Sequence, residues 1–289
     1  MYFTKILAFT AVILAAAPVT AEDLRSGGKL MLTNGVTSIE GSSGGGISTW
    51  ALIAGNETSN GIGGSVHVSV IALPDYDWQS HGAAIGLFDK VELSYARQNF
   101  NTRDIGAALG IGHDYVLRQD VFGAKLRLLG DAVYGSPWVP QVAVGVQHKR
   151  TLDGWVAKAV GAKETDGTDF YVAASKLSLS TSILMGATAR LTKANQNGLL
   201  GFGGDKNDDY AVQFEGTLGY QLARRFVVGG EYRTKPDNLG VAREDDWFDL
   251  YAAYAITKNV TATAAYVDLG SIATVPKQRG AFFSLQASF

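Results

Sequence analysis

The chain lacks cysteine altogether, and neither sign of charge is in marked excess, with 25 Lys and Arg against 27 Asp and Glu in 289 residues. Without cysteine, a disulfide-stapled fold, a cysteine-ligated zinc site and thiol catalysis are excluded. The net charge of −2 provides neither a basic surface for nucleic acid nor an acidic tail. What is abundant is glycine, at 35 residues beside an ordinary 46% of apolar residues, so the chain is neither disordered nor collagen-like.

Residues 1–21 have the pattern of a secretory signal peptide. Lys5 precedes an apolar run from Ile6 to Ala17, which ends at Pro18 and a tripeptide of small residues. This run is too short to cross a bilayer as a helix, which disfavours the alternative of a membrane anchor. No predominantly apolar stretch of helix-spanning length, about 18 residues, occurs later in the chain. We therefore expect export and a mature chain that begins near Glu22.

The mature chain alternates apolar and polar residues with a period of two, as a strand with one apolar face requires. No long segment with the helical period competes with this pattern. Eight segments show the alternation strongly: 66–70, 91–95, 122–128, 142–146, 212–220, 226–232, 248–256 and 283–289. Four weaker segments bring the expected number of strands to about 12, with 10 to 14 left open: 47–55, 170–177, 183–191 and 260–269.

Alternation by itself fits a soluble β-sandwich as well as a membrane barrel, but the connections favour a barrel. Outer-membrane barrels have long loops at one end and short turns at the other. Long polar segments at 99–119, 149–168, 192–209, 235–246 and 270–279 take turns with short ones at 178–180, 223–225 and 257–259. The segments 73–89 and 130–138 are too long for this scheme.

Aromatic residues support the same interpretation. Many lie near expected strand ends on the apolar face, as an interfacial girdle requires, and the chain ends on Phe289 without a polar tail. The aromatic residues in question are Trp50, Tyr95, Tyr220, Tyr232, Trp247, Tyr254, Tyr266, Phe283 and Phe289. Because unpaired strand edges are costly in hydrocarbon, the sheet must close. The prediction is an all-β, transmembrane antiparallel β-barrel of about 12 strands after a cleaved signal peptide.

This reasoning divides the chain into three parts: a signal peptide at 1–21, an N-terminal periplasmic or lumen-facing segment at 22–45, and the barrel at 46–289. Twelve strands spaced about 4.8 Å apart and tilted by about 40° leave a lumen of roughly 12 Å. A lumen of that width admits water and small solutes, or a plug.

The polar face of the strands then lines the lumen with both signs of charge. The candidate residues are Glu92, Lys125, Arg127, Gln141, Glu215, Glu231, Arg233 and Asp249. Such a lining predicts a passive or selective pore for small polar solutes. The alternative, at even weight, is a salt-bridged interior that only stabilises a closed structural or adhesive barrel.

Several segments resemble a proteobacterial family of exported barrel proteins catalogued as a domain of unknown function. They read YARQNF at 95–100, GTDFYV at 167–172, NQNGLLGFGGD at 195–205, EYRTKPDNLG at 231–240 and REDDW at 243–247. Glycine-rich segments at 27–30 and 44–46 also resemble it. The resemblance implies the Gram-negative outer membrane, where we expect a periplasmic N-terminus, and it supplies no functional residues.

Other chemistry is less well supported. His67 and Ser69 share one strand face and resemble the His-x-Ser pair of outer-membrane phospholipases, but the valines around them occupy the lipid side. Acidic loop residues near 205–209 and 244–246 are rich in oxygen ligands for divalent cations, or for bridging lipopolysaccharide, without EF-hand spacing. We expect no cofactor and no enzyme activity. The expected partners are outer-membrane lipid, lipopolysaccharide and the barrel-assembly machinery, the last through Phe289.

Overall fold

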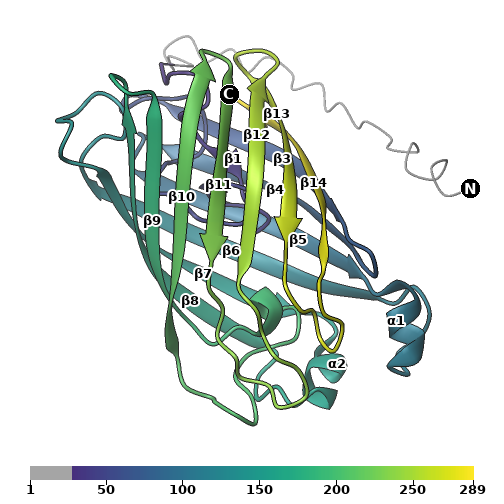
Figure 1. Cartoon of the computed structure of the whole chain (residues 1–289). Helices are drawn as coiled ribbons and strands as arrows, with labels where there is room; N and C mark the ends of the chain where they lie inside the picture. Colours follow the sequence, from purple (N-terminus) through teal and green to yellow (C-terminus); the bar gives the residue numbers. More distant parts are fainter. Residues whose placement is uncertain (1–27) are drawn as a thin grey trace, which may run out of the picture.

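The computed structural model describes residues 28–289, so the expected signal peptide lies outside the described residues. Twelve strands form a closed antiparallel barrel in which each strand pairs with its neighbours in chain order and the last pairs with the first (Figure 1). The strands are β3 (Ile62–Ala72), β4 (Asp77–Leu87), β5 (Val91–Asn101), β6 (Val116–Leu129), β7 (Gln141–Thr151), β8 (Asp166–Ser178), β9 (Ile183–Thr192), β10 (Ala211–Ala223), β11 (Phe226–Arg233), β12 (Trp247–Ala255), β13 (Val260–Asp268) and β14 (Arg279–Ser288). The predicted fold class and strand number are confirmed.

Apolar side chains face outward along these strands. On β3, Val66 and Val68 are 49% and 39% exposed, whereas His67 and Ser69 between them are 3% and 1% exposed. A soluble sheet would bury the valines and expose the polar residues. The reverse arrangement is that of a wall that faces acyl chains.

One expected strand is absent from the wall and one wall strand was not expected, so the total of twelve is unchanged. The segment 47–55 is not part of the wall, which begins only at Ile62, so the barrel boundary at residue 46 was drawn too early. The wall instead contains β4, inside the segment 73–89 that looked like a long connection. Its outward side chains include the polar Gln79 and His81, and its inward ones include Trp78, so the usual apolar-out alternation is weak there.

Most of the aromatic residues named face outward, which a girdle requires, although Tyr95 and Phe283 lie near the middle of their strands. Seven of them are exposed on the outer wall: Tyr95, Tyr220, Tyr232, Tyr254, Tyr266, Phe283 and Phe289. Trp50 and Trp247 are buried instead. Trp50 belongs to a segment inside the lumen, and Trp247 is the first residue of β12 and points inward.

The two ends of the barrel differ, as expected. The long-loop end carries the five long loops, with the helices α1 (Arg103–Ala108) and α2 (Gly154–Ala159) and the 3-10 turn η1 (Asn195–Gly198). The short-turn end carries the C-terminus, and its one long connection joins β6 to β7 (Figure 1). Among residues 28–289 no helix is both long and apolar enough to cross a membrane.

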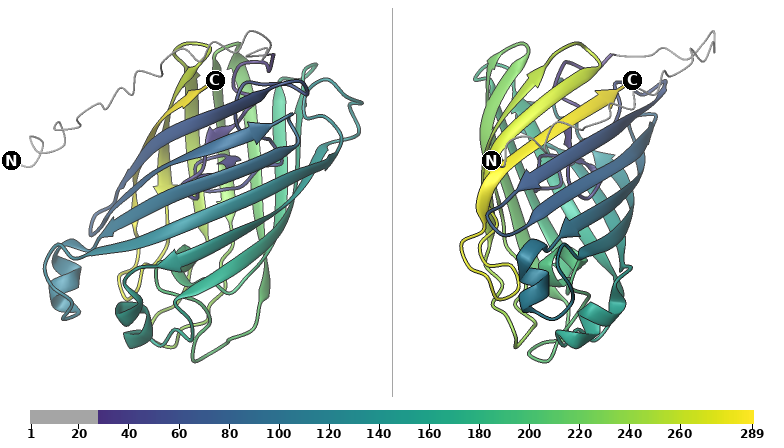
Figure 2. Two further views of the ribbon diagram at one scale, coloured as in Figure 1. Left: turned by 180° about the vertical axis from the view of Figure 1, so that it is seen from behind. Right: turned by 90° about the vertical axis from the view of Figure 1, so that its right-hand side faces the viewer.

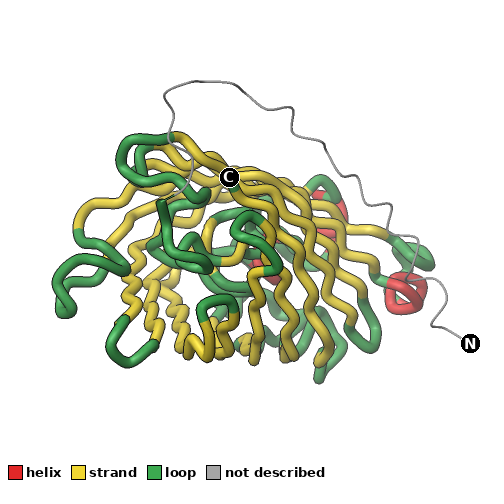
Figure 3. The backbone as a smooth tube through the Cα atoms, turned by 90° about the horizontal axis from the view of Figure 1, so that it is seen from above, coloured by secondary structure: helices red, strands yellow, loops and turns green. Residues whose placement is uncertain are grey.

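The lumen is filled by the N-terminal part of the described chain. Every residue from 33 to 55 is buried, and we call this stretch the plug. It lies within the ring of strands as loop with one short hairpin, in which β1 (Val36–Thr37) pairs with β2 (Ser43–Gly44) (Figures 2 and 3). Because a loop has few internal backbone hydrogen bonds, its buried N–H and C=O groups need partners from the wall.

Candidate functional site

The wall side chains predicted to line a lumen do point inward, and they meet the plug. Seven of the eight candidates are buried: Glu92, Lys125, Gln141, Glu215, Glu231, Arg233 and Asp249. The eighth, Arg127, lies at the short-turn end and is partly exposed. The polar face of the strands therefore forms a lining for the plug in this structure.

A buried charge cluster centres on Glu40 of the plug. Arg233 bridges both carboxylate oxygens of Glu40, through Nη1 at 2.9 Å and Nη2 at 3.1 Å. Arg190 Nη2 lies 3.3 Å from Oε2, and Lys149 Nζ donates to Oε1. Three cations from β7, β9 and β11 thus converge on one plug carboxylate.

Further carboxylates of the wall complete this cluster. Arg190 Nε donates to Glu215 Oε1 at 2.6 Å, and Lys149 Nζ lies 2.8 Å from Asp169 Oδ2. These pairs neutralise charges that would be very costly to bury alone. The cluster is therefore a closed network of ion pairs across plug and wall.

Wall carboxylates also accept hydrogen bonds from the plug backbone. Glu231 Oε2 accepts from the N–H of Ile47 at 2.9 Å, and its other oxygen accepts from the Ser48 hydroxyl. Glu215 Oε2 accepts from the N–H of Thr49 at 2.6 Å. These contacts satisfy the backbone N–H groups of Ile47 and Thr49, so this stretch of the plug does not need to pair with a wall strand.

The same pattern recurs on the other side of the plug. Lys125 pairs with Glu92 at 3.1 Å and donates to the carbonyls of Ser43 at 3.0 Å and Leu52 at 2.8 Å. Glu92 accepts from the N–H groups of Ser43 at 3.1 Å and Ala54 at 2.8 Å. Gln141 Nε2 donates to the carbonyl of Ala51 at 2.7 Å. Polar wall side chains thus take the place of a neighbouring strand.

Sequence reasoning missed four members of the charge cluster: Glu40, Lys149, Asp169 and Arg190. Arg190 lies at an inward position of a segment that was recognised as a strand. Lys149 lies inside the expected loop 149–168, and Asp169 directly follows it. Both residues belong to strands, because β7 and β8 extend further than their apolar alternation indicates. No local pattern marks Glu40, which lies outside any wall strand.

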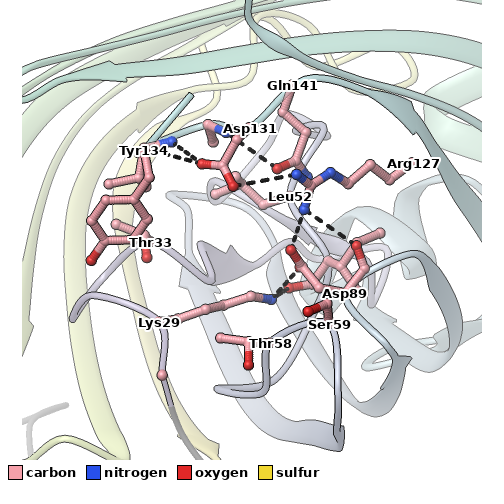
Figure 4. Close-up of a pocket in the computed structure, with 14 residues that line it drawn as sticks. Lys29, Thr33, Leu52, Thr58, Ser59, Asp89, Arg127, Asp131, Tyr134 and Gln141 are labelled. Carbon is pink, nitrogen blue, oxygen red and sulfur yellow. Dashed lines mark hydrogen bonds and ion pairs between the residues drawn. The ribbon is translucent and has the colours of Figure 1, made fainter. Parts of the chain in front are cut away.

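Arg127 occupies a different place, beside a cavity of about 320 Å³ at the short-turn end. Figure 4 shows Arg127 between Asp89 and Asp131, with Lys29 on the other side of Asp89. Lys29 Nζ lies 2.9 Å from Asp89 Oδ1, and Arg127 Nη2 lies 3.3 Å from Asp131 Oδ2. The charges at this mouth are already paired across the plug end and the wall.

The arrangement of His67 and Ser69 does not favour a hydrolase. His67 Nε2 is 3.2 Å from the hydroxyl of Ser80, and Ser69 Oγ donates to Ser284 Oγ at 2.8 Å. Both side chains face the lumen, away from lipid. The described part of the chain contains no group of three His, Asp or Glu residues placed to hold a metal ion.

Comparison with known proteins supports the fold and the family. Residues 33–286 match the model of a family described as "Protein of unknown function (DUF3034)". The chain belongs to this family. The resemblance expected from the sequence motifs is thereby confirmed, and the match includes the plug. No curated protein matches the chain in sequence.

Among solved structures, this family member is similar to two outer-membrane porins. A "KdgM porin" matches with a TM-score of 0.51 and 11% identity, over 78% of this chain and 99% of that one. A NanC porin matches with a TM-score of 0.50 and 12% identity, over 78% of this chain and 98% of that one. At this identity the likeness shows the fold, which is that of an outer-membrane β-barrel.

Proposed function

We propose that this protein is an outer-membrane channel for small polar solutes that is closed at rest by its own N-terminal plug. The observation that carries the proposal is the polar character of the contact between plug and wall. Glu40, Ser43, Ile47, Thr49 and Ala54 are held by charged side chains of the wall. Water can replace each such contact when the plug moves, whereas an apolar interface would be exposed at a large cost.

The wall without the plug offers a lining suited to small polar solutes. Its buried cations include Lys125, Lys149, Arg190 and Arg233, and its buried anions include Glu92, Asp169, Glu215, Glu231 and Asp249. Opposed charges in a narrow passage favour solutes that carry both signs or many hydroxyl groups. Arg127 and Asp131 extend this lining to the short-turn mouth.

A closed structural barrel is the second candidate, and one observation favours it. The long-loop end is sealed by a buried apolar cluster that includes Trp78, Phe100 and Trp247. Their rings meet edge to face, with centroids 5.5 Å apart for both Trp78–Phe100 and Trp78–Trp247. A channel requires this seal to open along with the plug.

A disulfide lock separates the two candidates. Ala51 of the plug packs in one buried cluster with Ala143 and Ala173 of the wall. Because the chain has no native cysteine, the double variant Ala51→Cys/Ala173→Cys forms a single cross-link between plug and wall. Ala143→Cys/Ala173→Cys is the matched control, since these two residues are paired across neighbouring strands and the bond leaves the plug free.

We expect planar-bilayer recordings of the plug–wall variant to show no openings when oxidised and to regain openings after reduction. The control variant should open equally in both states. Openings that persist in the oxidised lock would refute the plug as the gate. Silence of the reduced variant, the control and the unmodified protein at all voltages would reject the channel and favour the structural barrel.

We further propose that the short-turn end is periplasmic and that Phe289 is read by the barrel-assembly machinery. The carbonyl oxygen of Phe289 accepts from the N–H groups of Asn56 at 3.1 Å and Gly64 at 3.0 Å, while its ring stays exposed on the wall. Deleting Phe289 should lower the amount of heat-modifiable barrel in the outer membrane. Unchanged assembly would contradict this role. Contact with lipopolysaccharide at the long-loop end follows from the same orientation.

A further inference from the structure

A second cavity, of about 180 Å³, lies at the long-loop end and differs in character from the lumen. Two wall strands contribute Trp78 and Phe100 to it. Val156 of α2 and Leu199, just after η1, are among the loop residues that enclose it. The cavity is thus built from segments that are far apart in the sequence.

The cavity wall is almost entirely apolar. Its three polar side chains besides Trp78 already have partners: Thr102 donates to the carbonyl of Tyr115 at 2.9 Å, Tyr76 to that of Ile272 at 3.2 Å, and Gln196 to that of Ser271 at 3.0 Å. An enclosed apolar cavity of about 150 Å³ in another protein stays dry and accommodates benzene. The volume therefore suits one aromatic ring with a small substituent.

One residue that lines the cavity has a buried polar atom without a partner among the described residues. The indole of Trp78 is 2% exposed, and its Nε1–H donates to no acceptor in the described part of the chain. A buried donor without an acceptor costs about 1 to 3 kcal/mol. A ligand with a carbonyl or carboxyl oxygen would recover this loss.

We propose that this cavity binds a small monocyclic aromatic molecule that carries one hydrogen-bond acceptor, with the ring among Phe100, Leu117 and Leu199 and the acceptor on Trp78 Nε1. The cavity volume limits the ligand to about one ring, the apolar lining excludes charged groups, and the unpartnered indole N–H of Trp78 favours a hydrogen-bond acceptor. A polar solute of the kind that suits the lumen lining would lose its hydration in this apolar cavity and gain one hydrogen bond in return. The site is thus distinct from the lumen.

The segment that encloses the cavity also contacts the charge cluster of the plug. Leu199 lines the cavity, and Asn197 two residues earlier accepts hydrogen bonds from Lys149 Nζ at 2.9 Å and Arg233 Nη2 at 2.8 Å. Gln196 and Asn197 both have positive φ, at 44° and 62°, a conformation that is strained for glutamine and that asparagine adopts more readily. Resting on the proposed gating, we infer that the bound ligand changes how often the plug opens.

Binding is tested with a matched pair of probes, 4-fluoroacetophenone and 4-fluoroethylbenzene, which differ in the acceptor oxygen. Fluorine NMR of the full-length protein in one detergent measures both affinities, and partition into micelles is the same for every variant. Trp78→Phe removes the donor and keeps a ring. Trp247→Phe is the control, because Trp247 also has an unpartnered indole N–H and touches Trp78 but does not line the cavity.

We expect the unmodified protein to bind the ketone about three- to tenfold more tightly than the hydrocarbon, as one neutral hydrogen bond provides. Trp78→Phe should abolish this ratio and Trp247→Phe should keep it. Ile111→Trp should fill the cavity and weaken both probes, whereas Val241→Trp, on an exposed loop at the same end, should weaken neither. Equal binding by all variants would mean micelle partition only and would overturn the site.

Planar-bilayer recordings test the coupling to the plug separately from ligand binding. In the unmodified protein, the ketone should change the opening frequency with the same concentration dependence as the NMR signal. Binding without any change in openings would overturn the coupling and leave the site intact. Absence of binding alongside openings that respond to the disulfide lock would overturn the site and leave the proposed channel intact.

Discussion

Replacing Glu40 by Gln tests directly whether the buried charge cluster holds the plug in place. The variant keeps the size of the side chain and removes the charge that Lys149, Arg190 and Arg233 share. Lys149 and Arg190 retain Asp169 as a carboxylate partner, whereas the carboxylate left to Arg233 is Glu215 at 3.7 Å, beside neutral acceptors on Ile47 and Asn197. One cation is therefore left nearly uncompensated.

The loss of plug stability in Glu40→Gln can be estimated from the ion pairs that remain. Breaking a buried ion pair costs about 3 to 5 kcal/mol, and the remaining partners place this case near the lower limit. A loss of about 3 kcal/mol changes the ratio of docked to undocked plug roughly a hundredfold. The wall strands should keep their stability, because Glu40 belongs to the plug alone.

Hydrogen exchange followed by mass spectrometry measures this ratio for the plug and the wall in the same sample. Amides of residues 33–55 should exchange roughly a hundredfold faster in Glu40→Gln, and amides of the wall strands at the original rate. Glu164→Gln is the control, since Glu164 is 54% exposed and pairs with Lys193 in a loop, a contact worth less than about 1 kcal/mol. Plug amides that exchange at the original rate in Glu40→Gln would refute the reasoning.

Three further predictions address pH, close packing and lipid contact. Burial raises the pKa of Glu57, at the short-turn end, to about 7 from its ordinary 4.5. The contribution of Glu57 to stability should therefore be greatest below about pH 4.5 and should fall by up to about 3 kcal/mol as the pH rises to 7. Glu57→Gln should flatten this part of the pH dependence in gel-shift melting at about pH 5 and 8, whereas an equal slope in both proteins would exclude Glu57 as its source. A Cβ on Gly45 would lie 1.7 Å from Glu231 Oε1, so Gly45→Ala should speed plug exchange, whereas Gly216→Ala, with open space around it, should not; equal exchange would argue against the close fit. Leu250, 62% exposed on the outer wall, should cost about 2 to 4 kcal/mol as Leu250→Arg in a refolding titration into lipid vesicles, and a neutral result would argue against lipid contact.

The sequence predicts which wall side chains face the lumen on most strands, but not on β4. Glu92, Lys125 and Glu231 were assigned to the lumen because they alternate with large apolar neighbours, and in a strand alternate side chains must point to opposite faces. The same rule does not identify β4 as a strand of the wall, because Trp78 faces inward and the polar Gln79 and His81 face outward. Trp78 instead packs in the apolar seal at the long-loop end, a role that its neighbours in the sequence do not indicate.

The sequence by itself determined the barrel, its approximate strand number, the lipid-facing side of most strands and the unequal ends, because each follows from a period of two residues or from the spacing of turns. The tertiary structure alone decided that the lumen is occupied. Glu40 lies in a stretch with no period, and its partners come from Lys149, Arg190 and Arg233 on three separate strands. Local chemistry fixes which way a side chain points, but only closure of the ring brings these groups to one point.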